Sequence, residues 1–381
     1  MSLVETGIGL VKNKLPFDAW GSFKNPLLEN SSTEFLNPVH IEKLKEESAI
    51  TSWEILETVE VPGIGLLQKV GIVTEQGYAY AGFVGVPEKP ESTVPVIGTA
   101  AWFTSIEGHN EHSVRNLMRA GNFVFFLGSE GSYEPEELPE PKGPITLAGS
   151  ASAVLNFSYH YGKELAEEGH DVDIEERIVV GESRGGMVGM GIIALAEEFA
   201  QEIIMADLTA PCLPRAMELS DIKDLSNQII SEPAEIIKLG GKLTLGRLIH
   251  YPATLDLSRY SLAHQIAIGF ALFSGEAGAL ARHIPPESLL HITTFEKDFA
   301  SMKSEWEDIF TSHKNVRITP LPGSHLTLAD LETLKFIIGR NKAAQFCIAQ
   351  CTPLTKQNTF DAAHKLAAVQ HPLEYGEDVA A

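Results

Sequence analysis

The sequence contains few cysteines, and their number argues against a framework of disulfide bonds. The 381 residues include three, Cys212, Cys347 and Cys351. A small, odd number does not fit the paired cysteines of a disulfide-rich secreted fold. Cys347 and Cys351 are spaced to share one face of a helix, where cysteine more often packs as a small hydrophobic residue than binds a ligand. We therefore interpret the cysteines as those of an intracellular protein.

Basic residues are also scarce. The chain has 29 lysines and arginines against 51 aspartates and glutamates, which gives a formal net charge of -22. A surface with this excess of negative charge repels nucleic acid and anionic lipid. Neither a nucleic acid nor a membrane is expected as a partner.

Long apolar runs are missing as well. No window of the sequence approaches the roughly 18 uncharged apolar residues of a membrane-spanning helix. The opening stretch "MSLVETGIGLVKNKLPFDAWG" is interrupted by Glu5, Lys12 and Lys14, and it lacks the basic-then-apolar pattern of a secretory signal. These features predict a cytoplasmic protein.

The composition that is present is that of an ordinary globular protein. Hydrophobic residues make up 44% of the chain and charged residues 21%, which excludes disordered and fibrous classes. The length fits one large α/β domain with an insertion, or two domains. The pattern along the chain predicts an N-terminal extension (1–58), a core (59–212 and 286–340), a helical cap (213–285) and a helical C-terminal tail (341–381).

The core segments alternate between apolar strands and helices. Glycine-broken β-type runs from residue 59 predict an antiparallel opening to a sheet. Further strands are expected in "STVPVIGTAAWF", "NFVFFLG", "RIVV", "EIIMADLTAP", "SLLHITTFEKD" and "VRITPLPG", and helices in "EHSVRNLMRAG", residues 148–168, "GGMVGMGIIALAEEFA" and "LTLADLETLKFIIGR". Strands without polar alternation, each followed by a helix, predict a mostly parallel central sheet with helices on both faces.

One strand-to-helix junction has the pattern G-x-S-x-G, in "RIVVGESRGGM". Such a sharp turn forces its central residue, Ser183, into strained dihedral angles and lifts the hydroxyl above the sheet. It also places the backbone amide of Arg184 at a helix N-terminus, where it can donate to a developing oxyanion. The alternative is a glycine-rich turn with an idle serine. The glycines that would let the helix lie close to the sheet are Gly185, Gly186, Gly189 and Gly191.

A serine nucleophile needs a base, and the base needs an orienting acid. His325, in "ITPLPGSHLTLAD", follows a short strand and is the favoured base. Asp298, at the end of "LLHITTFEKD", is the favoured acid. Asp207 and Glu296 are the alternative acids. The last alternative is a site that needs no acid.

His109 and His112, in "EGHNEH", offer a competing reading as a pair of metal ligands. No third ligand follows at a recognisable spacing, so we expect no metal site. The two histidines are expected in the loop after a strand, at the rim of the pocket.

The order Ser183, Asp298, His325 on successive strand-to-helix turns resembles the α/β-hydrolase superfamily, over roughly residues 60–212 and 286–340. "GESRGG" is similar to its nucleophile elbow, "TTFEKDFA" to its acid turn and "LPGSHL" to its histidine loop. The resemblance implies a second oxyanion amide after the third strand, often marked His-Gly. Here that place reads "TAAWFTS", and Trp102 or Phe103 is the nearest positional match.

The resemblance implies a serine hydrolase without a cofactor. Ser183 would attack an acyl carbonyl, with a carboxylic ester as the default substrate and a thioester or an amide as alternatives. An apolar inner face of the cap, with Leu245, Leu248, Ile249, Ile268 and Phe270, would favour small or medium apolar substrates. The alternative is a helical pair that only enlarges the core. The rival from another class is a binding protein that keeps the fold without catalysis.

Overall fold

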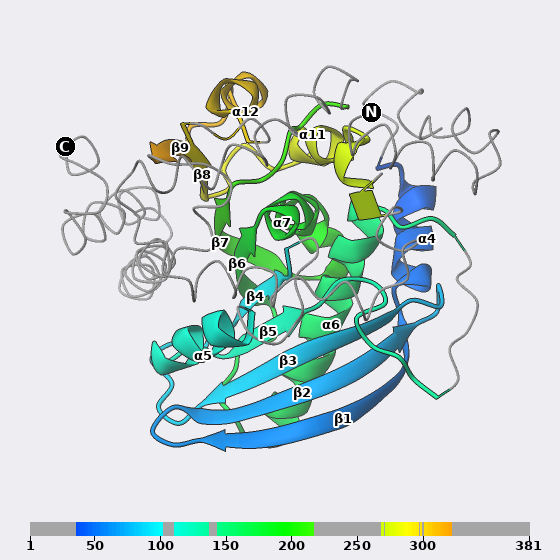
Figure 1. Cartoon of the computed structure of the whole chain (residues 1–381), viewed down its shortest axis with the longest axis vertical. Coiled ribbons are helices and arrows are strands. Elements are labelled where there is room, and N and C mark those ends of the chain that lie inside the picture. The colour runs from blue at the N-terminus through cyan, green and yellow to red at the C-terminus, as the bar shows by residue number, and fades with distance from the viewer. Residues whose placement is uncertain are drawn as a thin grey trace, which may run out of the picture.

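The computed structural model describes residues 36–101, 110–136, 143–216, 268–269, 271–296, 298 and 301–321. Its centre is a nine-stranded sheet with the strand order β1-β2-β3-β5-β4-β6-β7-β8-β9 (Figure 1). The expected mixture of an antiparallel opening and a longer parallel part is confirmed by the strand pairings.

The antiparallel edge consists of β1 (Ile50–Val61), β2 (Gly65–Thr74) and β3 (Ala79–Pro87). These strands pair in sequence order, and β3 is antiparallel to β5 as well. Most of β1 is exposed, whereas every residue of β3 is buried. Because β1 begins at Ile50, the boundary that we placed at residue 58 falls inside a strand, and the sheet takes in part of the expected N-terminal extension.

The parallel part consists of β4 (Val96–Thr99), β5 (Val124–Leu127), β6 (Glu176–Glu182), β7 (Glu202–Thr209), β8 (Leu290–Phe295) and β9 (Val316–Leu321). The chain runs from β4 to β5 on one side and then returns to β6 on the other side of β4. The strand order therefore reverses at β4. In open α/β sheets the crevice outside the carboxyl ends of the strands at such a point is where ligands bind.

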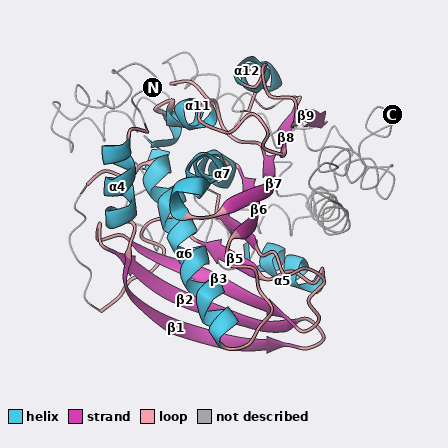
Figure 2. Ribbon diagram, turned by 180° about the vertical axis from the view of Figure 1, so that it is seen from behind, coloured by secondary structure: helices cyan, strands magenta, loops and turns pink. Residues whose placement is uncertain are grey.

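Helices cover both faces of the sheet, as expected. The described helices are α4 (Pro38–Glu47), α5 (Glu111–Arg119), α6 (Leu147–Glu167), α7 (Arg184–Leu195), α11 (Glu276–Ala281) and α12 (Lys303–Ile309), with the 3-10 turn η2 (Ala196–Phe199) after α7. Helices α4, α6, α7 and α11 pack together on one face, and α5 lies on the other against β2, β3 and β5 (Figure 2). None of the helices in these described ranges has both the length and the apolar content needed to cross a bilayer.

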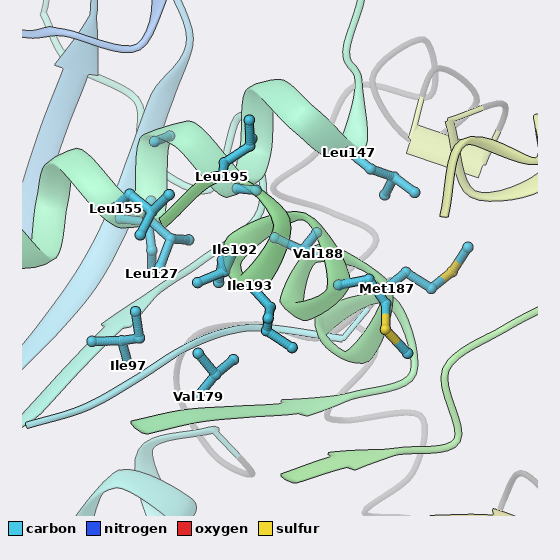
Figure 3. Packing of buried hydrophobic residues seen from close by; sticks show 14 of the residues in the cluster. Ile97, Leu127, Leu147, Leu155, Val179, Met187, Val188, Ile192, Ile193 and Leu195 are labelled. Atoms are coloured by element: carbon cyan, nitrogen blue, oxygen red, sulfur yellow. The ribbon is translucent and has the colours of Figure 1, made fainter. Parts of the chain in front are cut away.

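Helix α7 is buried almost all round, which explains its uninterrupted apolar sequence. Its residues Val188, Ile192 and Ile193 pack in the main core with Val179 of β6 and Leu155 of α6 (Figure 3). Helix α6 begins where the side chain of Thr146 accepts a hydrogen bond of 2.9 Å from the Gly149 amide.

The two described ends of the expected cap belong to the core. Residues 213–216 follow the loop after β7, and α11 packs against α6 and α7. Ile268, which we expected on the inner face of a cap, is 1% exposed and lies in the main core cluster. Residues 217–267, with Leu245, Leu248 and Ile249, lie outside the described residues, as do Phe270 and the tail at 341–381.

Gly191 marks a close approach between helices and predicts a stability effect. A Cβ atom there would lie 2.8 Å from the Cβ of Ala151 in α6 and 3.2 Å from Leu280 Cδ1 in α11. We expect Gly191→Ala to lower the free energy of unfolding by about 1–3 kcal/mol through overpacking. The matched control is Gly162→Ala in α6, whose nearest neighbour, Arg177 Nη2, would be 3.4 Å away. That substitution should stabilise by about 0.5–1 kcal/mol. Urea unfolding measures both, and equal stability of the two variants would contradict the tight packing.

Candidate active site

Ser183 occupies the turn between β6 and α7, and its backbone is strained. Its dihedral angles are φ 53 and ψ -117, so it is one of three non-glycine residues with positive φ in the described ranges. A conformation of this kind costs on the order of 1–3 kcal/mol and persists only where the surrounding structure enforces it. The expected strand-to-helix turn with a strained central serine is therefore present. The Ser183 side chain is half-buried, at the carboxyl end of β6 beside the switch point.

The flanking glycines explain how the turn can close. A Cβ atom on Gly181 would overlap the carbonyl oxygen of Gly185, and one on Gly185 would overlap the carbonyl oxygen of Thr99 at the end of β4. A Cβ atom on Gly186 would lie 3.2 Å from the Cβ of Pro211, so a side chain would be crowded there as well. The pattern G-x-S-x-G is thus required by backbone contacts on both sides of the serine.

The backbone around Ser183 is fixed by hydrogen bonds to the neighbouring strand. Its amide donates to the carbonyl of Thr209 at the end of β7, at 2.8 Å, and its carbonyl accepts from the Met187 amide at 3.2 Å. Arg184 is the first residue of α7, so its amide is one of the unpaired donors of a helix N-terminus. The other two expected oxyanion residues, Trp102 and Phe103, lie outside the described residues.

The loop after β7 bends back toward the turn. Ala210 has φ 46, and its amide donates to the Thr293 carbonyl of β8 at 2.7 Å. The buried Trp306 of α12 donates its indole N–H to the Pro211 carbonyl at 3.3 Å. These contacts position the next residue, Cys212, whose thiol hydrogen-bonds with the Ser183 side chain.

Cys212 joins Ser183 and Asp298 in one cluster. Burial and the nearby Asp298 carboxylate together raise the pKa of the Cys212 thiol to about 12, against the lowering effect of a hydrogen bond with the Ser183 side chain. Asp298 is 3% exposed, in the turn after β8. The structure therefore brings the expected nucleophile and the favoured acid close to the same thiol. The sequence analysis missed Cys212, although its position three residues beyond a strand at this edge is a usable signal.

The two alternative acids have other surroundings. Asp207 is buried inside β7 and pairs with His291 of β8, with 3.2 Å between Asp207 Oδ1 and His291 Nδ1. The other ring nitrogen of His291 lies 2.9 Å from Thr319 Oγ1 of β9. Glu296 is exposed. Asp298, by contrast, acts on the same Cys212 thiol as the Ser183 side chain, which favours it as the acid.

The candidate base and the candidate metal pair are not placed. His325 and His109 lie outside the described residues, and for His112 only the backbone, in α5, is described. Among the residues that the structure does place, no three side chains of histidine, cysteine, aspartate or glutamate gather as a metal site would require.

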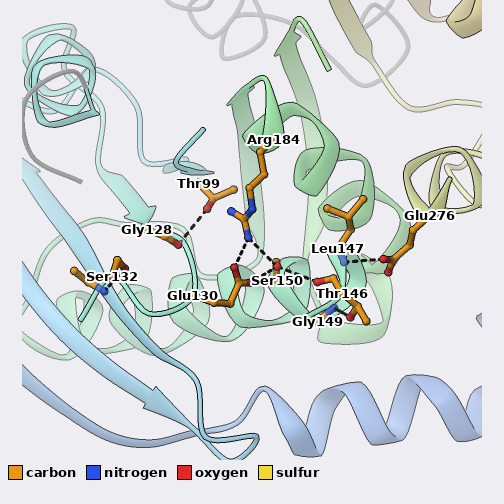
Figure 4. A network of polar contacts seen from close by, with 11 residues as sticks. Thr99, Gly128, Glu130, Ser132, Thr146, Leu147, Gly149, Ser150, Arg184 and Glu276 are labelled. Carbon is orange, nitrogen blue, oxygen red and sulfur yellow. Dashed lines mark hydrogen bonds and ion pairs between the residues drawn. The ribbon is translucent and has the colours of Figure 1, made fainter. Parts of the chain in front are cut away.

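A buried polar network lies directly beside the turn (Figure 4). Arg184 Nη2 is 2.5 Å from Glu130 Oε2 and 3.0 Å from Ser150 Oγ, and the Arg184 and Glu130 side chains are each 1% exposed. Glu130 also contacts the Ser150 hydroxyl. The sequence analysis used only the backbone amide of Arg184. No role was predicted for the Arg184 side chain or for Glu130.

Glu276 of α11 caps the first turn of α6 in the same region. Its carboxylate accepts from the amides of Leu147 and Ala148, each at 2.9 Å. Burial, with a smaller contribution from nearby Glu130, raises the pKa of Glu276 to about 7. The two backbone hydrogen bonds act in the opposite direction and are included in that value. A buried carboxyl therefore titrates near neutral pH close to the candidate site.

Comparison with known proteins supports the fold. No protein-family model matches the chain, and no curated protein matches it in sequence. Among solved structures, a serine hydrolase from the polyaromatic-hydrocarbon-degrading bacterium Cycloclasticus zankles has a TM-score of 0.51 at 12% identity, covering 72% of this chain and 96% of that one. An acetyl xylan esterase from Paenibacillus sp. R4 has a TM-score of 0.45 at 14% identity, covering 85% and 99% of the two chains.

The strand order, the turn at Ser183 and the structural likeness together define the class of protein. The chain has the α/β-hydrolase fold, as the resemblance in sequence predicted.

Glu276 predicts a pH dependence of stability. Its pKa is about 7 in the folded protein, against 4.5 for an ordinary glutamate, so the folded state binds more protons between these values. The stability contribution of Glu276 should therefore fall as the pH rises from about 5 to 7. We therefore compare the free energies of unfolding of the wild type and Glu276→Gln. The wild-type value minus the variant value should decrease over that pH range by a few kcal/mol. Urea unfolding at pH 5 to 8 measures it. A difference that stays constant with pH would rule out the raised pKa, and Glu287→Gln, at an exposed position, is the matched control.

Proposed function

We propose that the protein is a serine hydrolase that cleaves a carboxylic ester through an acyl-enzyme intermediate. The observation that carries the proposal is the backbone of Ser183, held at φ 53 and ψ -117 at the carboxyl end of β6. Strain of this kind in a polar residue beside a sheet's switch point points to function, because a packing role does not require it.

The roles of the other residues follow from the chemistry of acyl transfer. His325 accepts the proton of the Ser183 hydroxyl and later donates it to the leaving group, and Asp298 orients the imidazole. Support for Asp298 comes from its proximity to Cys212, whose thiol hydrogen-bonds with Ser183. The amide of Arg184, at the start of α7, stabilises the oxyanion together with an amide from Trp102 or Phe103.

The substrate class is an ester of a small or medium apolar acid or alcohol. A thioester or an amide would follow the same acyl-enzyme route. The rival function is binding without catalysis. A binding protein gains nothing from a strained serine whose flanking glycines are fixed by backbone contact, so the turn at Ser183 argues for the enzyme.

The first test concerns the nucleophile. We expect the wild type to react with a fluorophosphonate probe and to hydrolyse p-nitrophenyl esters, and Ser183→Ala to lose labelling and about 10⁶-fold in kcat. The melting temperature should stay near that of the wild type, because the hydroxyl contributes little packing. Labelling of Ser183→Ala equal to that of the wild type would refute the assignment. A folded wild type that is inert to the probe and to esters would favour the binding role.

The second test separates the two buried aspartates. We expect Asp298→Asn to lower kcat by about 1,000- to 10,000-fold, less than Ser183→Ala, with little change in stability. Asp207→Asn should instead lower the free energy of unfolding by about 1–3 kcal/mol, because it weakens the buried pair with His291. Steady-state kinetics and urea unfolding of both variants measure this. The reverse result would place the acid on β7.

A further inference from the structure

Arg184 carries a buried charge one residue after the nucleophile. Its side chain is 1% exposed and pairs with Glu130, which is equally buried. Its second terminal nitrogen, Nη1, is buried and has no hydrogen-bond partner among the residues that the structure describes. Desolvating two charges costs several kcal/mol each, and a partly satisfied guanidinium recovers less of that cost. A hydrophobic pair of similar volume would serve stability at least as well, so the charged pair calls for another role.

Glu130 is held in place by the loop after β5. The Gly128 and Gly131 amides donate to the carbonyls of Ala81 and Ala79 on β3, at 2.7 and 2.8 Å. The Thr99 hydroxyl at the end of β4 lies 3.4 Å from the Gly128 carbonyl. Tyr80 on β3 adds a hydrogen bond to the Glu130 carboxylate. The carboxylate is thus presented from a fixed loop that β3 and β4 support.

Ser150 links this pair to α6. Its hydroxyl contacts Glu130, accepts from Arg184 Nη2 at 3.0 Å and lies 2.9 Å from the Thr146 carbonyl. Three elements therefore meet at the Arg184 side chain: the loop after β5, α6 and α7. Strand β4 supports that loop through Thr99. Figure 4 shows the guanidinium reaching from the start of α7 to Glu130 and Ser150.

Resting on the proposed function, we infer that Glu130 and Ser150 are positioning residues that act through Arg184 to hold the nucleophile turn and the oxyanion-binding amide in register. Arg184 is joined covalently to Ser183, and its amide is the one that faces the oxyanion. Fixing the far end of its side chain restricts rotation of the first turn of α7, and the strained conformation of Ser183 depends on that turn. Positional errors of about 1 Å at a reacting group can lower rates about 100-fold.

The test compares rate and stability in variants that separate charge from packing. Glu130→Gln keeps the shape and removes the charge, and Ser150→Ala removes the hydroxyl from the pair. We expect both variants to slow fluorophosphonate labelling and to lower kcat for a p-nitrophenyl ester, Glu130→Gln by about 10- to 100-fold, with KM within about twofold of the wild type. Arg184→Lys keeps the charge but loses the planar fork that reaches both Glu130 and Ser150, so we expect this variant to have a lower kcat than the wild type as well.

The matched control is Ser158→Ala on the same helix. The Ser158 hydroxyl is buried, lies 2.9 Å from Gln201 Oε1 and 3.4 Å from Arg177 Nε, and sits by the opposite end of β6 from Ser183. It matches Ser150 as a buried serine beside an arginine. Its variant should lower the melting temperature without changing kcat.

The double variant Glu130→Leu/Arg184→Met decides between positioning and plain stability. It removes both buried charges together, so its melting temperature should return to or exceed that of the wild type. Positioning predicts that kcat and the labelling rate stay low in this variant. Recovery of kcat along with the melting temperature, or a Ser150→Ala variant as active as Ser158→Ala, would overturn the inference. Should Glu130→Gln not fold, Ser150→Ala and the double variant still decide. A wild type that is inert while folded would instead refute the proposed function, and the inference with it.

Discussion

The close approach of three backbone segments around Ser183 is the constraint on which the rest of the structure depends. The carbonyls of Thr99 and Gly185 occupy the space where side chains at residues 185 and 181 would lie, so β4, β6 and α7 meet at backbone contact. Such contact sets how closely α7 lies on the sheet. Its small and apolar residues, and the alanine of α6 that faces Gly191, follow from that fixed position.

Buried charges are the second level of organisation at this edge of the sheet. Arg184 pairs with Glu130, Asp207 pairs with His291, and Glu276 accepts two amides of α6. Each interaction joins different elements of secondary structure. In a low-dielectric interior an alternative packing would leave one of these charges unpaired at high cost, so the interactions select one arrangement more than they add stability.

Local patterns allowed most of the strands, helices α5, α6 and α7 and the serine turn to be predicted, because burial and turn geometry leave their mark on adjacent residues. Only the end of strand β1 fell within the β-type runs predicted from residue 59. Its earlier part was missed because most of its residues are exposed, so no burial pattern marks it. The partners of the buried charges could not be predicted for a different reason. Arg184 and Glu130 are 54 residues apart, and Leu147 and Glu276 are 129 apart. Which of these segments meet depends on the strand order, which no local pattern encodes.

Asp207 and Asp298 lie at the same edge of the sheet in different surroundings: the first pairs adjacent strands, and the second is the acid that we propose for catalysis. Asp207 lies inside β7, two residues before the strand ends at Thr209, and there it faces His291 of the neighbouring strand. Asp298 lies three residues beyond the end of β8, as Cys212 lies three beyond β7 and Ser183 one beyond β6. The side chain of Asp207 joins two adjacent strands, whereas the residues beyond the strand ends lie at the edge of the sheet where open α/β sheets bind ligands. The position of a carboxylate relative to the end of its strand therefore separates the structural pair from the residue that we propose for catalysis.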